Sequence, residues 1–167
     1  MERDGVTAKV LPTETYFSTV KKQLDENGQA FVRVTGTSMQ PLLKHLTDGV
    51  IIVPPESIHT GDIVLFDRRN GRYALHRIIR KKKDGFTMAG DNQWYFETGL
   101  PYNQIIGVVD AIERNGKRIP RNNIFLKIYS FVMTQLTFPR IYIRTALIQM
   151  KRLLDQSGNN DRKGVRE

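Results

Sequence analysis

Apolar residues recur at helical spacing near the start of the chain, between residues 13 and 27. Thr13 can cap the first turn with its hydroxyl group, and Gly28 can end the helix in a left-handed conformation. The apolar side chains that share one face of this helix are Tyr16, Phe17, Val20 and Leu24. We therefore predict one helix that packs against the rest of the domain.

From residue 30 to about residue 120 the pattern is that of β-strands. Apolar and β-branched runs alternate with turn signals, and three of these signals are Asn-Gly or Asp-Gly pairs, which favour tight hairpins. Strands that are joined so closely must be antiparallel. The runs that we predict to be strands are 31–34, 50–53, 63–66, 73–79 and 105–112.

The pattern changes again after Pro120. Residues 122–138 and 140–154 each have the composition of a helix, and Pro139 lies between them. Since proline lacks an amide hydrogen and clashes with the preceding turn, we predict a hinge there. The longest uncharged stretch, residues 128–139, is well short of the roughly 20 apolar residues that cross a bilayer.

Together these patterns predict a mainly β fold, with a coiled antiparallel sheet or a partly open barrel, one N-terminal helix and two C-terminal helices. We divide the chain into a β domain with its N-terminal helix (1–120), a helical pair packed on that domain (121–155) and a flexible polar tail (156–167).

The second C-terminal helix has an apolar face and a basic face. The basic side chains are Arg140, Arg144, Lys151 and Arg152. Such a helix either covers the apolar face of the sheet or lies on an anionic membrane surface. We favour core packing and keep peripheral contact with an anionic membrane as the alternative.

Composition limits the chemistry. The chain has 167 residues and no cysteine, which excludes disulfides, thiolate catalysis and cysteine-ligated zinc. Its histidines lack the spacing of a metal site, so we predict neither a metal nor a cofactor. The first residues lack the apolar core of a signal peptide, so we expect a cytoplasmic location.

The net charge of +9 favours contact with an acidic partner, such as nucleic acid or anionic lipid. A helix-turn-helix head needs two helices, and only one fits before the first predicted strand. We therefore do not expect nucleic acid as a partner, although the charge keeps a nucleic-acid regulator among the alternatives.

Three separate residues are candidates for catalytic chemistry. Ser38 follows a strand, and Gly36 allows the backbone to turn sharply so that the serine presents its hydroxyl and amide outward. His76 lies within a predicted strand, and Asp91 lies in a Gly-Asp-Asn turn. A hydroxyl, an imidazole and a carboxylate in this order can serve as a nucleophile, its base and the group that orients the base.

These motifs together resemble the superfamily of type I signal peptidases and the self-cleaving domains of LexA-like repressors. The resemblance covers about residues 30–110, and the C-terminal helices are more loosely similar to those of a small bacterial subgroup without a membrane anchor. It implies a coiled sheet of the signal peptidase and LexA type, a peptide or protein substrate bound as an extended strand, and no metal. The motifs that carry it are Gly36–Pro41, Gly61–Val64, Leu75–Ile78, Gly90–Asn92 and Ile106–Gly107.

The resemblance also implies roles for single residues. Ser38 is the implied nucleophile, and its backbone N–H is the implied oxyanion donor. His76 stands where many bacterial members have a lysine base and other members have a histidine; a neutral imidazole, with an ordinary pKa of about 6.5, accepts a proton near neutral pH. Arg77 alternates to the opposite face of the strand. Asp91 is the third member that we predict, because its carboxylate could bond the other imidazole nitrogen. Glu97 is the alternative, because histidine-type relatives often have a second acidic position shortly after Gly-Asp.

The function that we predict is that of a serine endopeptidase, signal-peptidase-like or self-cleaving, which forms an acyl-enzyme on Ser38 with His76 as general base. The alternative is a catalytically inactive module that keeps the fold and binds peptides or has a regulatory role.

Overall fold

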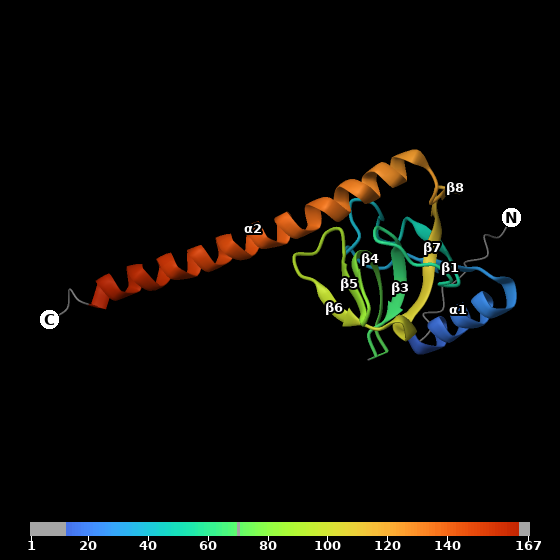
Figure 1. The fold of residues 1–167 in the computed structure, drawn as a ribbon, viewed down its shortest axis with the longest axis horizontal. Coiled ribbons are helices and arrows are strands. Elements are labelled where there is room, and N and C mark those ends of the chain that lie inside the picture. Colours follow the sequence, from blue (N-terminus) through green and yellow to red (C-terminus); the bar gives the residue numbers. More distant parts are fainter. Residues whose placement is uncertain (1–12, 70, 164–167) are drawn as a thin grey trace, which may run out of the picture.

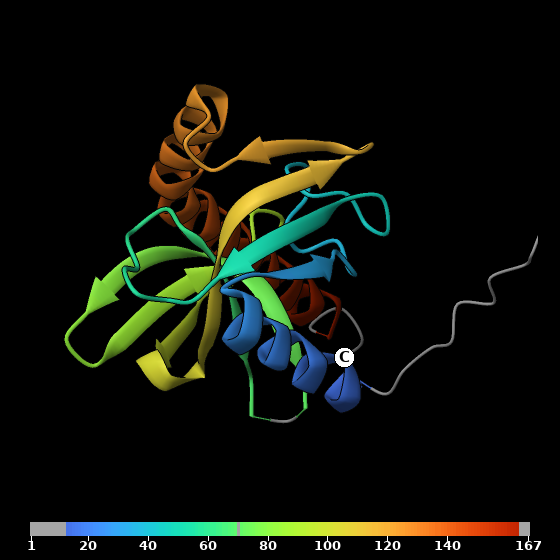
Figure 2. The same ribbon diagram turned by 90° about the vertical axis from the view of Figure 1, so that its right-hand side faces the viewer.

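The computed structural model describes residues 13–69 and 71–163, and side chains up to residue 152. The described part of the chain begins with helix α1 (Thr13–Asn27), as predicted. At its end the Gly28 amide donates to the Leu24 carbonyl at 3.0 Å, and Gly28 has a φ of 67°. Val20 and Leu24 are buried, so the predicted apolar face packs on the domain. Figure 2 shows α1 lying beside β1.

The sheet is antiparallel throughout, which confirms the predicted fold class, and it is not closed into a barrel. Its strands follow the order β1-β2-β7-β3-β4-β5-β6, and β8 pairs with β7. A short helix, η1 (Tyr102–Gln104), precedes β7. The strands are β1 (Ala30–Arg33), β2 (Gly49–Val53), β3 (Ile63–Asp67), β4 (Tyr73–Lys82), β5 (Gly85–Ala89), β6 (Glu97–Leu100), β7 (Ile105–Arg114) and β8 (Lys117–Pro120).

The hairpin turns follow the local sequence. Asn115 and Gly116 join β7 to β8 with φ angles of 52° and 72°, the left-handed conformations that a tight type I′ turn requires. Lys83 and Asp84 join β4 to β5, since Lys82 pairs with Gly85. Such turns force their flanking strands to run antiparallel, so the predicted hairpins are present, although β5 and β8 were not among the predicted strands.

Apolar side chains pack on both faces of the sheet. Successive residues of β3 alternate between the two clusters, with Leu65 in the cluster beneath α1 and Phe66 in the other. Neither face of the central strands is therefore free for solvent.

One prediction about the C-terminal region is wrong. Residues 124–163 form a single helix, α2 (Ile124–Lys163), with Pro139 inside it, instead of two hinged helices. Of the tail predicted at 156–167, residues 164–167 lie outside the described residues. Residues on both sides of the proline contact the same loop. The ring centroids of Phe138 and Phe96 lie 4.8 Å apart, and Arg140 donates to the Gln93 carbonyl. These contacts hold the two halves in line despite the hydrogen bond that Pro139 removes.

The two halves of α2 differ in their surroundings. Asn123 caps the helix, since its Oδ1 accepts from the Phe125 amide at 2.9 Å. The first half lies against the sheet, and its Thr134, Thr137 and Ile141 are buried. Beyond residue 141 every described side chain is exposed, and Figure 1 shows this half extending away from the body.

Candidate active site

Ser38 lies in a turn after β1 and is half-buried. Gly36 has a φ of 115°, a conformation that favours glycine, and its amide donates to His45 Nδ1 at 2.8 Å. Met39 is buried beneath the turn. The sequence predicted this sharp turn and its apolar anchor, but not the imidazole that holds Gly36.

The loop after β5 supports the Ser38 turn. The Asn92 amide donates to the Ser38 carbonyl at 2.8 Å, and Asn92 Nδ2 donates to the Thr37 carbonyl at 3.3 Å. A Cβ atom added at Gly90 would lie only 2.5 Å from the Ser38 carbonyl oxygen. The Gly-Asp-Asn motif therefore lets two backbone segments approach each other closely.

His76 lies in β4, opposite Val64 of β3, and is 0% exposed. Its ring centroid lies 5.4 Å from that of Phe66. Its Nδ1 lies 3.1 Å from Glu97 Oε1, although neither ring nitrogen has a partner in hydrogen-bond geometry among the described residues. Buried polar atoms in proteins are nearly always hydrogen-bonded, so an unsatisfied imidazole marks this position as unusual.

Glu97, at the start of β6, is held between His76 and a cation. Arg68 Nε donates to Glu97 Oε2 at 3.0 Å, and Arg68 Nη2 donates to the other carboxylate oxygen. Burial by itself would raise the pKa of Glu97, but the interactions with His76 and Arg68 outweigh it and lower the pKa to about 2. Glu97 is therefore a carboxylate at any physiological pH.

Ser38 and His76 line one cavity of about 170 Å³, which brings together the two residues that the sequence singled out. Arg68, Gly36 and Gln93 also line it. The structure does not join Ser38 to His76 by a hydrogen bond, since His76 Nε2 has no partner within residues 13–69 and 71–152. Catalytic hydrogen bonds are often long in unliganded enzymes and shorten when substrate binds.

Asp91 does not contact the imidazole. Its carboxylate accepts two hydrogen bonds from Arg77, at 2.8 and 2.7 Å, and both side chains are 1% exposed. Arg77 points to the opposite side of β4 from His76, as the alternation of a strand requires. In the structure Asp91 therefore does not bond His76, contrary to the hypothesis. Its carboxylate is bound by the nearer cation, Arg77.

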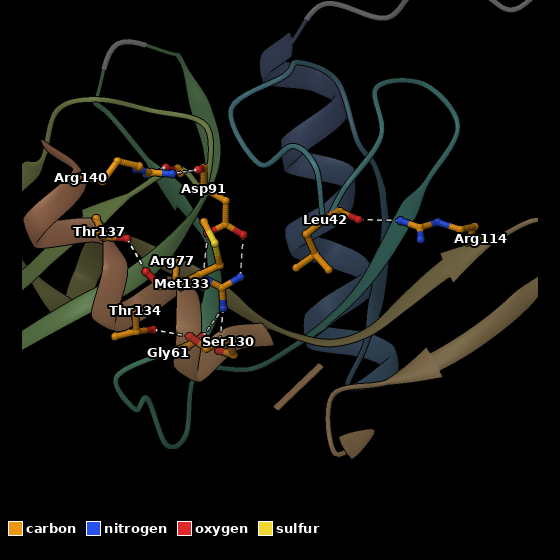
Figure 3. Close-up of polar contacts among 11 residues, drawn as sticks. Leu42, Gly61, Arg77, Asp91, Arg114, Ser130, Met133, Thr134, Thr137 and Arg140 are labelled. Carbon is orange, nitrogen blue, oxygen red and sulfur yellow. Dashed lines mark hydrogen bonds and ion pairs between the residues drawn. The ribbon is translucent and has the colours of Figure 1, made fainter. Parts of the chain in front are cut away.

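The Arg77–Asp91 pair connects the sheet to α2, as Figure 3 shows. Arg77 Nη1 donates to Ser130 Oγ of α2 at 2.6 Å and to the Gly61 carbonyl at 2.8 Å. Arg140 of α2 donates to the Gln93 carbonyl at 2.9 Å and also to the Asp91 carbonyl. The helix therefore binds the loop after β5, and the other side of this loop supports the Ser38 turn.

Sequence reasoning missed Arg68, which follows β3 and carries no motif. It identified Glu97 only as the nearest second acidic residue after Gly-Asp. In the described ranges no cluster of three or more His, Asp or Glu side chains is placed to hold a metal ion. In the same ranges no helix is long and apolar enough to cross a membrane.

Two comparisons with known proteins bear on this site. The family model described as Peptidase S24-like matches residues 5–110, which contain the Ser38 turn, β4 and the Gly-Asp-Asn loop. No curated protein matches the chain.

Proposed function

The chain belongs to the Peptidase S24-like family, and on that basis we propose that it is a serine peptidase with Ser38 as nucleophile and His76 as general base. The observation that carries the proposal is the state of His76. This buried imidazole has a carboxylate 3.1 Å from Nδ1, has no partner at Nε2, and lines the same cavity as Ser38. A ring nitrogen that is buried and unsatisfied is free to accept a proton.

In the proposed reaction, the Ser38 hydroxyl transfers its proton to His76 Nε2 while Oγ bonds to the carbonyl carbon of the scissile peptide. The backbone N–H of Ser38 donates to the oxyanion that forms. The imidazolium then passes the proton to the leaving amine, and the C–N bond breaks. Water, deprotonated by His76, hydrolyses the acyl-enzyme and frees Ser38.

We assign the orienting role in this mechanism to Glu97 and not to Asp91. Glu97 lies beside Nδ1, and its low pKa keeps it negatively charged while the imidazole becomes a cation. Asp91 is a positioning residue, since its backbone and its pairing with Arg77 hold the loop that supports the Ser38 turn.

The substrate class that fits this proposal is a peptide or protein bound in extended form. Strand addition supplies backbone hydrogen bonds without requiring a particular sequence. Cleavage of the chain itself and cleavage of another protein both agree with this chemistry, and the cytoplasm stays the predicted location.

The test is covalent labelling with a serine-reactive peptide phosphonate, read by intact mass and by mapping of the labelled peptide. We expect one adduct on Ser38, which is absent in Ser38→Ala and forms more slowly in His76→Ala. Ser18→Ala is the matched control, because Ser18 is an exposed hydroxyl on α1.

An adduct that persists in Ser38→Ala would overturn the assignment of the nucleophile. A folded protein that forms no adduct, yet binds extended peptides, would instead be the catalytically inactive binding module.

A further inference from the structure

Helix α2 carries a long apolar stripe on the side that faces away from the sheet. The exposed fractions of its members range from 43% for Val132 to 78% for Phe125. Large exposed apolar surfaces of this kind mark interaction sites. The members of this stripe are Phe125, Ile128, Val132, Leu136, Ile143, Leu147 and Met150.

The stripe is a consequence of helical spacing. Residues 125, 128, 132, 136, 143 and 150 succeed one another by three or four positions, or by seven, so they fall on one face of the helix. The buried residues Thr134, Thr137 and Ile141 belong to the other face, which packs on the sheet. The sheet therefore does not cover the stripe, contrary to the favoured prediction that the apolar face of this region packs in the core.

The charges of α2 up to residue 152 are of one sign. Between residues 124 and 152 the sequence has the cations Lys127, Arg140, Arg144, Lys151 and Arg152 and no Asp or Glu. None of them reaches a carboxylate of the described side chains: Arg140 donates to backbone carbonyls, and Arg144 lies over the Trp94 ring, 4.2 Å from its centroid. An apolar stripe beside unneutralised cations is typical of a helix that lies in the interface of an anionic bilayer.

The charge pattern distinguishes between the candidate occupants of the stripe. A second copy of the chain would bury the apolar residues, but it would bring together two helices whose residues 124–152 each carry five cations and no anion. An anionic lipid surface buries the same residues in its acyl region and supplies negative headgroups to the flanking cations.

From these observations we infer that α2 is a membrane-surface helix that binds anionic lipid. The part of α2 whose side chains are described, residues 124–152, corresponds to roughly 40 Å of helix. The helix lies parallel to the membrane plane, with Phe125, Leu136 and Ile143 among the acyl chains and Lys151 and Arg152 at the headgroups. This inference does not depend on catalysis by Ser38.

Binding in this orientation also has a consequence for the Ser38 cavity. Arg140 donates hydrogen bonds to the Gln93 and Asp91 carbonyls, and the amide of the neighbouring Asn92 donates to the Ser38 carbonyl. The membrane-bound helix thus holds the cavity near the lipid surface by a short chain of hydrogen bonds.

The experiment is flotation of the full chain with vesicles of phosphatidylcholine alone, or of phosphatidylcholine and phosphatidylglycerol in equal parts. We expect the protein to float with the mixed vesicles and much less with the neutral ones. The triple variant Phe125→Gln, Leu136→Gln, Ile143→Gln should lose flotation. Because these side chains are exposed, its thermal unfolding should match that of the wild type.

Charge is tested separately. Lys151→Glu with Arg152→Glu should weaken binding to the mixed vesicles by at least about tenfold, since each basic residue near an anionic surface contributes about 1 kcal/mol, or a factor of about five. The matched control, Lys82→Glu with Lys83→Glu, makes the same change of net charge on exposed residues at the β4–β5 turn and should leave flotation unchanged.

Equal flotation of the wild type and the triple variant would overturn the inference. So would a dimer, measured by light scattering, that requires Phe125, Leu136 and Ile143 in a protein that binds no vesicles; in that case a second copy covers the stripe. Phosphonate labelling of Ser38 is read in parallel, and because it needs no lipid, failure of either proposal leaves the other standing.

Discussion

His76 Nδ1 and Glu97 Oε1 lie 3.1 Å apart although the residues come from β4 and β6, two strands that are separated in the sheet by β5. The pair is enclosed: His76 is fully buried, and the other side of Glu97 is held by Arg68. This contact identifies which of the two candidate carboxylates the proposed mechanism uses.

Replacing Glu97 by glutamine keeps its size and removes its charge. We expect Glu97→Gln to slow phosphonate labelling of Ser38 by at least about a hundredfold, because an amide does not stabilise the imidazolium that forms as Ser38 loses its proton. Glu26→Gln is the control, since Glu26 is exposed on α1. A Glu97→Gln protein that labels at the wild-type rate would exclude the assigned role.

The low pKa of Glu97 also predicts how stability depends on pH. The pKa is about 2 in the folded protein against an ordinary value of 4.5, so the carboxylate stabilises the fold above about pH 4.5. That contribution is lost as the pH falls towards about 2. We expect the difference in free energy of unfolding between wild type and Glu97→Gln, measured with urea, to shrink over this range. A difference that does not change with pH would contradict the assigned pKa.

The buried Arg77–Asp91 pair should matter more for stability than for chemistry. Arg77→Met leaves the Asp91 carboxylate buried without its cation, which costs about 3–5 kcal/mol in free energy of unfolding. The double variant Arg77→Met, Asp91→Leu should recover much of this loss, because it leaves no unpaired buried charge. Urea unfolding measures both values, and equal stability of the single and double variants would argue against the pair.

Gly90 should be required for the geometry of the Ser38 turn. In Gly90→Ala the new Cβ would lie 2.5 Å from the Ser38 carbonyl oxygen, so one of the two loops must move. We expect slower labelling of Ser38 and a lower melting temperature. Gly116→Ala is the comparison: no atom lies within 4 Å of its added Cβ, but its φ of 72° strains the backbone. It should lower the melting temperature and leave labelling unchanged.

Local chemistry explains which parts of the fold were predicted. The left-handed conformations of Asn115 and Gly116, the end of α1 at Gly28, and the Ser38 turn after Gly36 all depend on residues within a few positions of one another. Pro139 shows the limit of such reasoning. Its local preference predicts a break, yet contacts made by Phe138 and Arg140 with a loop more than forty residues away keep α2 continuous.

The sequence by itself determined the antiparallel sheet and brought Ser38 and His76 forward as candidates, because turns, strand periodicity and motif order are local properties. Only the tertiary structure decided which carboxylate lies beside His76. Asp91 is nearer in sequence, but Arg77 projects from the opposite face of β4 and binds it. The position of Glu97 depends on irregular pairing of β5 with both of its neighbours, which shifts the register of β6 relative to β4. Such shifts arise from packing across the sheet and leave no mark in the local pattern.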